Sequence, residues 1–452
     1  MLDQDSLGIL RAALERLDSG FAALPELPAG GTDRAALERV LMDVAGRLHD
    51  NYPYFHPLYA GQMLTPPHPV ARLAYMLAMW INPNNHALDG GRASSRMEKE
   101  AVAAIARMFG WSEHLGHLCG GGTMANLEAL WIAGRTHPGA AVLGSDQAHY
   151  THGRISAVLE LPFESIASDV RGRMDLAALE RRLAKGGVGT VVATLGTTAT
   201  GAVDPLPALL ELRARHGFRL HVDAAYGGYF TLADNLAPEA RAAFDRIGEA
   251  DSIVIDPHKH GLQPYGCGCV LFRDPEVGRH YRHDSPYTYF TSDELHLGEI
   301  SLECSRAGAA AVALWATQAL FPLERGGRFA RGLSDSRAAA LALHRRLESD
   351  PRFVTPFEPE LGIVVWTVRA PRASQASEAA RRVFAAAAGE DLHLALAELP
   401  ATFFARAAPE MERDRATVTC LRSVLMKPEH LAWVDRIWER IERAAAALLA
   451  GA

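Results

Sequence analysis

Three short stretches of the chain combine residue types that could hold and convert a small molecule. A glycine triplet at 120–122 comes directly before a predicted helix, Asp223 follows the apolar run RLHV, and Lys259 comes shortly after the apolar run SIVI. Glycines and the free N–H groups of a helix start favour a phosphate. A carboxylate at a strand end can pair with a ring cation, and a lysine in a pocket can become an amine nucleophile.

Each stretch also has an ordinary interpretation when it is taken alone. The glycines could form a plain loop, Asp223 could cap a helix or turn, and Lys259 could be a solvated surface cation. The triplet matches neither the Walker pattern nor the dinucleotide-binding pattern, which favours a phosphate other than that of a nucleotide. The three stretches come in order at the ends of successive predicted strands of one sheet, but these signals do not yet establish a shared site.

The elements around these stretches predict an α/β fold. Between about residues 115 and 275, short apolar runs alternate with helical patterns. This alternation predicts a largely parallel sheet with helices on both faces, whose ligands bind at the carboxyl ends of the strands. The predicted strands are AAVLGS, TVVATLG, RLHVDAA, SIVIDP and GCVLFRD, and the predicted helices include DLAALERRLAKG and PLPALLELRARHG.

Length and periodicity divide the chain into three parts. We predict an N-terminal helical arm at 1–60, a large domain at 61–325 and a small C-terminal α/β domain at 326–452. The small domain should contain strands in FVTPFEPELGIVVWTV and TVTCLRSVLMKPEH. The pattern Ser95-x-x-Glu98 resembles a capping box, so we expect Glu98 to cap the start of a helix.

Composition restricts the class of protein. The chain has 452 residues, 48% of them hydrophobic, and a formal net charge of −7, which argues against a general nucleic-acid binder. The N-terminus lacks the pattern of a secretory signal, and no apolar run predicts a transmembrane span. The five scattered cysteines indicate reduced thiols and therefore a cytoplasmic protein.

Several motifs together resemble a known family. GGGTMAN, AHYTH, GTTATGAVDP, HVDAAYGG and DPHKHG, with HPLYAGQMLTPPHPVARLA and INPNNHALDGGRASSRMEKEAV upstream, are similar to the ordered motifs of the group II pyridoxal-phosphate-dependent amino-acid decarboxylases. The resemblance covers most of residues 50–320. It implies the fold-type I architecture of the aspartate aminotransferase type, pyridoxal 5'-phosphate as cofactor, and decarboxylation of an L-amino acid. It also implies a homodimer in which the N-terminal arms embrace the partner.

The resemblance gives roles to individual residues. Lys259 should hold the cofactor aldehyde as a Schiff base, and Asp223 should keep the pyridine nitrogen protonated so that the ring acts as an electron sink. Ala225 should pack beneath the ring and His149 should stack on the opposite face. The remaining predicted contacts are Gly122, Thr123, Met124 and His258 at the phosphate, and Thr198 near the ring substituents.

The substrate contacts are predicted in the same way. Arg306 resembles the family's carboxylate-binding arginine, and a loop tyrosine, either Tyr287 or Tyr289, should reprotonate Cα; we prefer Tyr289. The aromatic stretch NYPYFHPLYAGQM, which includes His56, and the loop PYTYF suit an aromatic amino acid. No additional arginine pair indicates a second substrate carboxylate.

Other functions remain open at this point. Arg422 could bind a carboxylate from the small domain, as in an aminotransferase of the same fold, and an acidic or diamino acid could be the substrate. A non-catalytic sensor that keeps the cofactor pocket is a further alternative. His258, His260, Cys267 and Cys269 lie within a short window, but their spacing matches no common zinc pattern, so we predict no metal.

Overall fold

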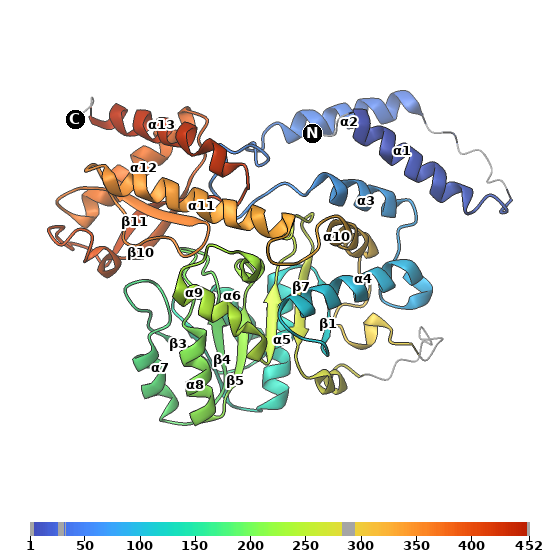
Figure 1. The fold of residues 1–452 in the computed structure, drawn as a ribbon, viewed down its shortest axis with the longest axis horizontal. Helices are drawn as coiled ribbons and strands as arrows, with labels where there is room; N and C mark the ends of the chain where they lie inside the picture. The colour runs from blue at the N-terminus through green and yellow to red at the C-terminus, as the bar shows by residue number, and fades with distance from the viewer. Residues whose placement is uncertain (1–3, 26–30, 32, 283–293, 450–452) are drawn as a thin grey trace.

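A seven-stranded sheet forms the centre of the computed structural model, which describes residues 4–25, 31, 33–282 and 294–449 (Figure 1). The four pairings from β6 to β3 are parallel, whereas β7 runs antiparallel to both of its neighbours. The predicted α/β fold with a largely parallel sheet is confirmed. In spatial order the strands are β1 (Leu115–Cys119), β7 (Gly268–Phe272), β6 (Ser252–Ile255), β5 (Arg219–Asp223), β4 (Val188–Thr194), β2 (Ala141–Ser145) and β3 (Phe163–Ile166).

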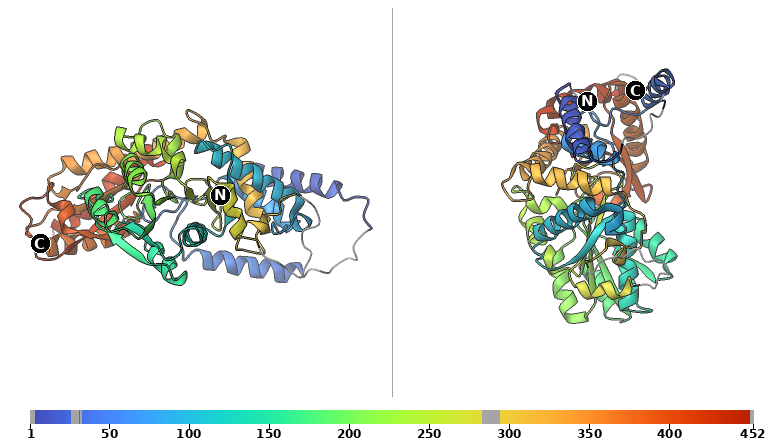
Figure 2. Two further views of the ribbon diagram at one scale, coloured as in Figure 1. Left: turned by 90° about the horizontal axis from the view of Figure 1, so that it is seen from below. Right: turned by 90° about the vertical axis from the view of Figure 1, so that its right-hand side faces the viewer.

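Helices cover both faces of this sheet (Figures 1 and 2). In the central strand β4, Val191 and Ala193 belong to one buried apolar cluster and Val192 belongs to another. Successive side chains of a strand point to opposite faces, so each face has its own core. The helices of this part are α3 (Pro69–Met79), α4 (Leu88–Met108), α5 (Gly122–Thr136), α6 (Thr151–Val158), α7 (Leu176–Leu183), α8 (Leu206–His216), α9 (Pro238–Asp245) and α10 (Gly308–Leu320).

The sequence analysis did not predict the two edge strands, β1 and β3. β1 has the sequence LGHLC and β3 has the sequence FESI, so neither is a continuous apolar run. β3 is only partly buried. An edge strand needs less apolar surface than a central one, and its sequence signal is correspondingly weaker.

A smaller antiparallel sheet follows in the C-terminal part of the chain. Its order is β10 (Ala395–Pro400), β11 (Thr417–Val424), β9 (Ile363–Val368) and β8 (Phe353–Val354). It packs with α11 (Arg328–Ser349), α12 (Ala373–Gly389) and α13 (His430–Leu449) around a further core that includes Trp366. The 3-10 helices are η1 (Gly228–Leu232), η2 (Ile247–Glu249), η3 (Pro275–His280), η4 (Leu297–Glu299) and η5 (Ala401–Phe404).

Glu360 joins the two sheets. Its carboxylate accepts a hydrogen bond from the Val203 N–H at 2.6 Å and contacts the guanidinium groups of Arg171 and Arg173. Glu360 directly precedes the segment that enters β9, whereas Val203 follows β4 of the large sheet. The contact therefore ties the small sheet to the loop that carries the motif GTTATG.

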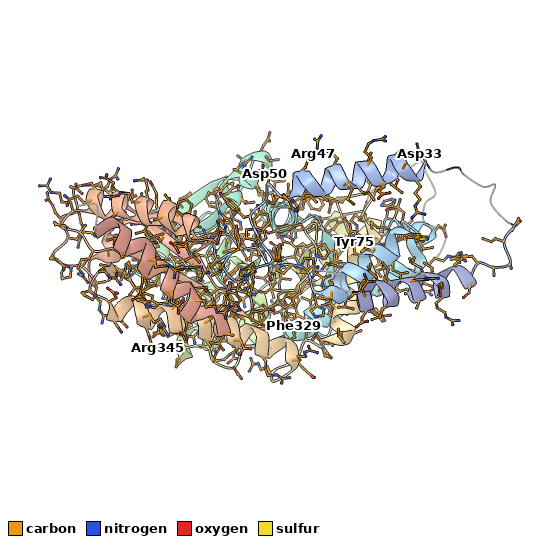
Figure 3. All side chains as sticks on the ribbon, turned by 90° about the horizontal axis from the view of Figure 1, so that it is seen from above. Asp33, Arg47, Asp50, Tyr75, Phe329 and Arg345 are labelled. Atoms are coloured by element: carbon orange, nitrogen blue, oxygen red, sulfur yellow. The ribbon has the colours of Figure 1, made fainter. Side chains whose placement is uncertain are left out.

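The first two helices extend beyond the body of the molecule. α1 (Gln4–Ser19) and α2 (Arg34–Leu48) contain no buried residue, and they project on the side opposite the C-terminal helices (Figures 1 and 2). Figure 3 shows α2 running along the outside of the molecule between the labelled Asp33 and Arg47. The Asp33 side chain caps α2 by accepting the Ala36 N–H at 3.0 Å. None of the described helices has the length and apolar character needed to cross a membrane.

Candidate active site

A cavity of about 330 Å³ opens at the carboxyl ends of β4, β5 and β6. It brings together residues from distant parts of the chain, as expected for a largely parallel sheet. All nine residues predicted to contact a cofactor line it, namely Gly122, Thr123, Met124, His149, Thr198, Asp223, Ala225, His258 and Lys259.

Asp223 ends β5 as a buried carboxylate with three hydrogen-bond donors. One oxygen lies 2.9 Å from Nε2 of His152 and 3.3 Å from Nδ2 of Asn126, and the other accepts the Ala225 N–H at 3.1 Å. Burial acts to raise the pKa of Asp223, but the hydrogen bond and charge of His152 and the Ala225 N–H outweigh it and hold the pKa below its usual range. The carboxylate therefore stays ionised and can keep a ring nitrogen protonated.

Asn126 is itself held by hydrogen bonds to buried polar groups on the side away from Asp223. Its Oδ1 lies 2.8 Å from Nε2 of His221, and Nδ1 of His221 lies 2.9 Å from the Ser252 hydroxyl. Burial, together with the neighbouring charge of His152, lowers the pKa of His221 to about 3, so this ring is neutral near pH 7. Sequence reasoning missed Asn126, His152 and His221, although they lie inside the motifs GGGTMAN, AHYTH and HVDAAYGG.

The glycine triplet forms the opposite end of the cavity. Gly121 has φ +145°, a conformation that favours glycine, and α5 begins at the next residue. A Cβ atom on Gly122 would lie 2.8 Å from Oδ2 of Asp256, so a side chain there would force this carboxylate to shift. The start of α5 has no side-chain cap, which leaves its N–H groups available for an anion.

Lys259 lines the same cavity. Its Nζ is 3.1 Å from Oδ2 of Asp256, a residue that the sequence analysis did not select. Nδ1 of the adjacent His258 lies 2.8 Å from the Cys267 carbonyl oxygen, and burial lowers the pKa of His258. The Lys259 amine is thus held in the cavity by an ion pair with Asp256, three residues earlier in the chain.

His149 is half-buried at the cavity wall. Its Nδ1 accepts the Thr151 N–H at 3.3 Å, and its ring packs against Tyr150 with 4.4 Å between ring centroids. Burial lowers the pKa of His149, although the charge of Asp223 partly opposes this effect. A neutral ring is suited to stacking on a flat conjugated ligand.

Arg306 lies outside this cavity, contrary to the role predicted for it. Its guanidinium contacts the Glu98 carboxylate at 2.6 Å and the Leu118 carbonyl at 2.7 Å, in a separate space of about 190 Å³. Its Nε has no hydrogen-bond partner, but the Glu98 carboxylate already neutralises the guanidinium, which leaves it less suited to binding a substrate carboxylate than a buried cation without an anion. The predicted cap was also wrong, because Glu98 lies in the middle of α4 and holds Arg306 there.

The other predicted residues have different locations. His56 does not line the cavity; its ring packs edge-on against Trp433 at 4.9 Å, and its Nδ1 accepts the Leu58 N–H. Tyr287 and Tyr289 lie outside the described residues. Within the part of the chain that the structure describes, no group of three or more histidine, cysteine, aspartate or glutamate residues could hold a metal ion.

Comparison with known proteins decides the family. The model of the pyridoxal-dependent decarboxylase conserved domain matches residues 139–369, about half of the chain. The chain belongs to the pyridoxal-dependent decarboxylases. The decarboxylase is therefore an amino-acid carboxy-lyase that depends on pyridoxal phosphate.

Relatives agree with this assignment. The decarboxylase is 29% identical over 315 residues to the "Probable L-tyrosine/L-aspartate decarboxylase" of Methanothermobacter thermautotrophicus, covering 68% of this chain and 82% of the relative. It is 34% identical over 268 residues to the "Probable L-aspartate decarboxylase" of Halobacterium salinarum, covering 58% and 71%. The structure of Oryza sativa TDC with PLP and tryptamine has the same fold, with a TM-score of 0.79, 19% identity and 99% of each chain covered.

The residues of the cavity fit pyridoxal phosphate. The ionised Asp223 suits the ring nitrogen, the uncapped start of α5 at Gly122 suits the phosphate, and the Lys259 amine lines the same cavity. One oxygen of the buried Asp256 carboxylate has no hydrogen-bond partner, which is consistent with a polar ligand at the phosphate end.

We predict that His221 makes folding stability depend on pH. Its pKa is lower in the folded protein than in the unfolded chain, so the stability that it confers is present above pH ~6.5 and is lost as the pH falls toward its folded value. Relative to wild type, His221→Gln should show a shallower loss of unfolding free energy below pH ~6.5, by up to about 1.4 kcal/mol per pH unit. Urea unfolding at several pH values measures these slopes.

The matched control for this prediction is His137→Gln, since His137 is exposed at the end of α5. Its slope should equal that of wild type. Equal slopes for wild type and His221→Gln would contradict the prediction.

Proposed function

We propose that the decarboxylase acts on an aromatic L-amino acid, releasing carbon dioxide and the corresponding amine. The observation that carries this proposal is Tyr265, whose exposed ring packs against His258 at the cavity, with 4.6 Å between centroids. The Tyr265 hydroxyl donates to the Met63 carbonyl at 3.3 Å, which links the ring to the aromatic segment that contains Tyr59. Flat apolar surfaces beside the cofactor favour a flat apolar side chain.

Each residue of the cavity would have a separate role in the reaction. Pyridoxal phosphate, when bound, supplies a conjugated ring that accepts the electron pair of the broken bond. Asp223 stays ionised and would hold the proton at the ring nitrogen, while the neutral His149 would cover one face of the bound ring and exclude water from it. Lys259 provides the amine and can exchange a proton with Asp256 at 3.1 Å. The substrate carboxylate still needs a partner that orients it.

We propose Arg422 as that partner, in place of Arg306. Arg422 lies on β11 with 6% of its surface exposed, and its Nε has no hydrogen-bond partner. No aspartate or glutamate among the described residues lies within ion-pair distance of it. Burial lowers the pKa of Arg422, and the nearby Tyr226, which lines the cavity, acts in the opposite direction. A buried cation without an anion is suited to a carboxylate ligand.

An acidic substrate is the second candidate. Lys427 is 2% exposed, and its Nζ donates to the Tyr59 carbonyl at 2.7 Å. Like Arg422, it has no carboxylate within ion-pair distance in the described part of the chain. Two buried cations near Tyr59 would favour a substrate with two carboxylates, and the Halobacterium salinarum relative bears the name of an L-aspartate decarboxylase.

We predict that the purified, cofactor-loaded protein converts an amino acid to its amine when it is incubated with single amino acids and no keto-acid acceptor. Mass spectrometry should detect the amine as the amino acid less the mass of carbon dioxide. Tyrosine, tryptophan or phenylalanine should react at least about tenfold faster than aspartate, glutamate or a diamino acid, because their rings can pack against the exposed Tyr265 ring. Faster turnover of an acidic amino acid would favour the second candidate. A keto acid limited to the amount of cofactor would indicate transamination, and binding without turnover would indicate a sensor.

We predict that Arg422→Gln lowers kcat/KM by about 100-fold, the effect of removing one charge-assisted contact to the substrate. Cofactor absorbance should be retained, since the residue would contact only the substrate. Arg369→Gln, at the exposed end of β9, is the matched control and should leave kcat/KM unchanged. Unaltered kcat/KM in folded Arg422→Gln would refute this role.

We also propose that the decarboxylase forms a homodimer through its N-terminal helices. One face of α2 exposes a row of apolar side chains at helical spacing, which water would not favour in an isolated chain. These residues are Leu37, Val40, Leu41, Val44 and Leu48, each between 44% and 61% exposed.

The corresponding prediction compares two substitutions on α2. Leu41→Glu should weaken dimerisation by at least about tenfold, because it places a charge in a desolvated contact. Arg39→Glu, on the opposite face of the helix, should leave the dimer intact. Sedimentation velocity over a range of concentrations measures the association. A wild-type protein that sediments as a monomer at all concentrations would overturn the proposal.

We propose a cytoplasmic location. All five cysteines are free thiols, and four of them are buried. Reduced thiols are typical of reducing compartments.

A further inference from the structure

Asp256 is a buried carboxylate at the phosphate end of the cavity, directly after β6. Only 3% of its surface is exposed. Its Oδ2 lies 3.1 Å from Nζ of Lys259 and 3.6 Å from Nε2 of His258, whereas its Oδ1 is buried without a hydrogen-bond partner. The carboxylate is thus satisfied on one oxygen only, by a lysine whose amine is required elsewhere in the reaction.

The carboxylate packs directly against the glycine loop. A Cβ atom on Gly122 would lie 2.8 Å from Oδ2 of Asp256 and 3.2 Å from its Oδ1. Gly122 is the first residue of α5, and no side chain caps this helix start. A phosphate held by the free N–H groups would therefore lie next to a buried carboxylate.

These two anions lack enough positive charge around them. A phosphate monoester carries nearly two negative charges near pH 7, and like charges at contact distance in a buried site disfavour the ionised form of one of them. Lys259 is the one cation within ion-pair distance of Asp256 among the described residues, while burial lowers the pKa values of His258 and His149. The other titratable groups that sense the charge of Asp256 are Cys119, Cys267, Cys269, Tyr229 and Tyr265.

We propose that Asp256 takes up a proton when the cofactor's phosphate binds, and then donates its O–H to a phosphate oxygen. In the empty protein it is a carboxylate paired with Lys259. The proton relieves the repulsion between the two anions and frees Lys259 from its ion pair. Cofactor affinity consequently falls as the pH rises, because the proton becomes harder to acquire. This inference rests on pyridoxal phosphate binding in the cavity and is independent of which amino acid is decarboxylated.

The test measures proton uptake by the cofactor-free protein. The probe is pyridoxine 5'-phosphate, which carries an alcohol in place of the reactive aldehyde and so binds without joining Lys259. Isothermal titration calorimetry in two buffers of different ionisation enthalpy gives the number of protons bound. Wild type should take up about one proton more than Asp256→Asn, and its affinity should fall by up to about tenfold per pH unit above pH ~7, against a flatter dependence in the variant.

Two matched controls separate this role from a general structural one. Glu303 places a second carboxylate on the glycine loop, where it accepts the Gly120 N–H at 3.2 Å, but on the exposed side. Glu303→Gln should take up as many protons as wild type. Unphosphorylated pyridoxine should show no difference between wild type and Asp256→Asn.

Equal proton uptake and equal pH dependence in wild type and Asp256→Asn would overturn the proposal. Thermal unfolding of Asp256→Asn establishes that the variant is folded during the comparison. Failure of the phosphate probe to bind wild type would overturn both the cofactor site and the role of Asp256, whereas binding without a difference would overturn only the latter.

Discussion

The site depends on keeping one buried carboxylate ionised. Asp223 is largely shielded from water, and burial alone would favour its neutral form. The His152 ring, the Asn126 amide and the Ala225 N–H counteract this cost, and each of the three comes from a different segment of the chain. The parallel sheet makes the arrangement possible, because it brings the ends of several strands and the starts of their helices to one edge. An electron-accepting ring can be maintained only where this balance holds.

The same constraint explains the polar layer behind the cavity. Asn126 can present its amide N–H to Asp223 only if its carbonyl oxygen is satisfied elsewhere, and His221 provides that partner. His221 is in turn fixed by Ser252 on the adjacent strand. Because the Asn126 side chain and both ring nitrogens of His221 are paired, this chain of contacts holds a single orientation, so the position of the carboxylate is determined by residues two contacts away.

The sequence predicted the parts of the site that are local in the chain. Asp223 and Lys259 each end an apolar run and can be identified from their neighbours alone. Contacts between distant segments could not be found in this way. Glu98 and Arg306 were interpreted separately, as a helix cap and a substrate contact, although they bind each other across 208 positions. Arg422 was predicted only as a possible carboxylate contact in an alternative function, that of an aminotransferase. Its burial without an anion depends on how the small sheet packs, which the sequence does not reveal. The edge strands β1 and β3 were missed because their sequences are short and only partly apolar.

The contacts of Glu360 affect how the protein unfolds. Glu360 lies in the C-terminal part of the chain, yet it accepts the Val203 N–H and binds Arg173 within the large sheet's loops. Separating the two parts would leave a buried charge on one side and an unpaired backbone N–H on the other. The large and the small sheet, with the cores packed on them, are therefore expected to melt in a single cooperative transition rather than as independent units, and a partly unfolded form that retains only the cofactor cavity should be scarcely populated.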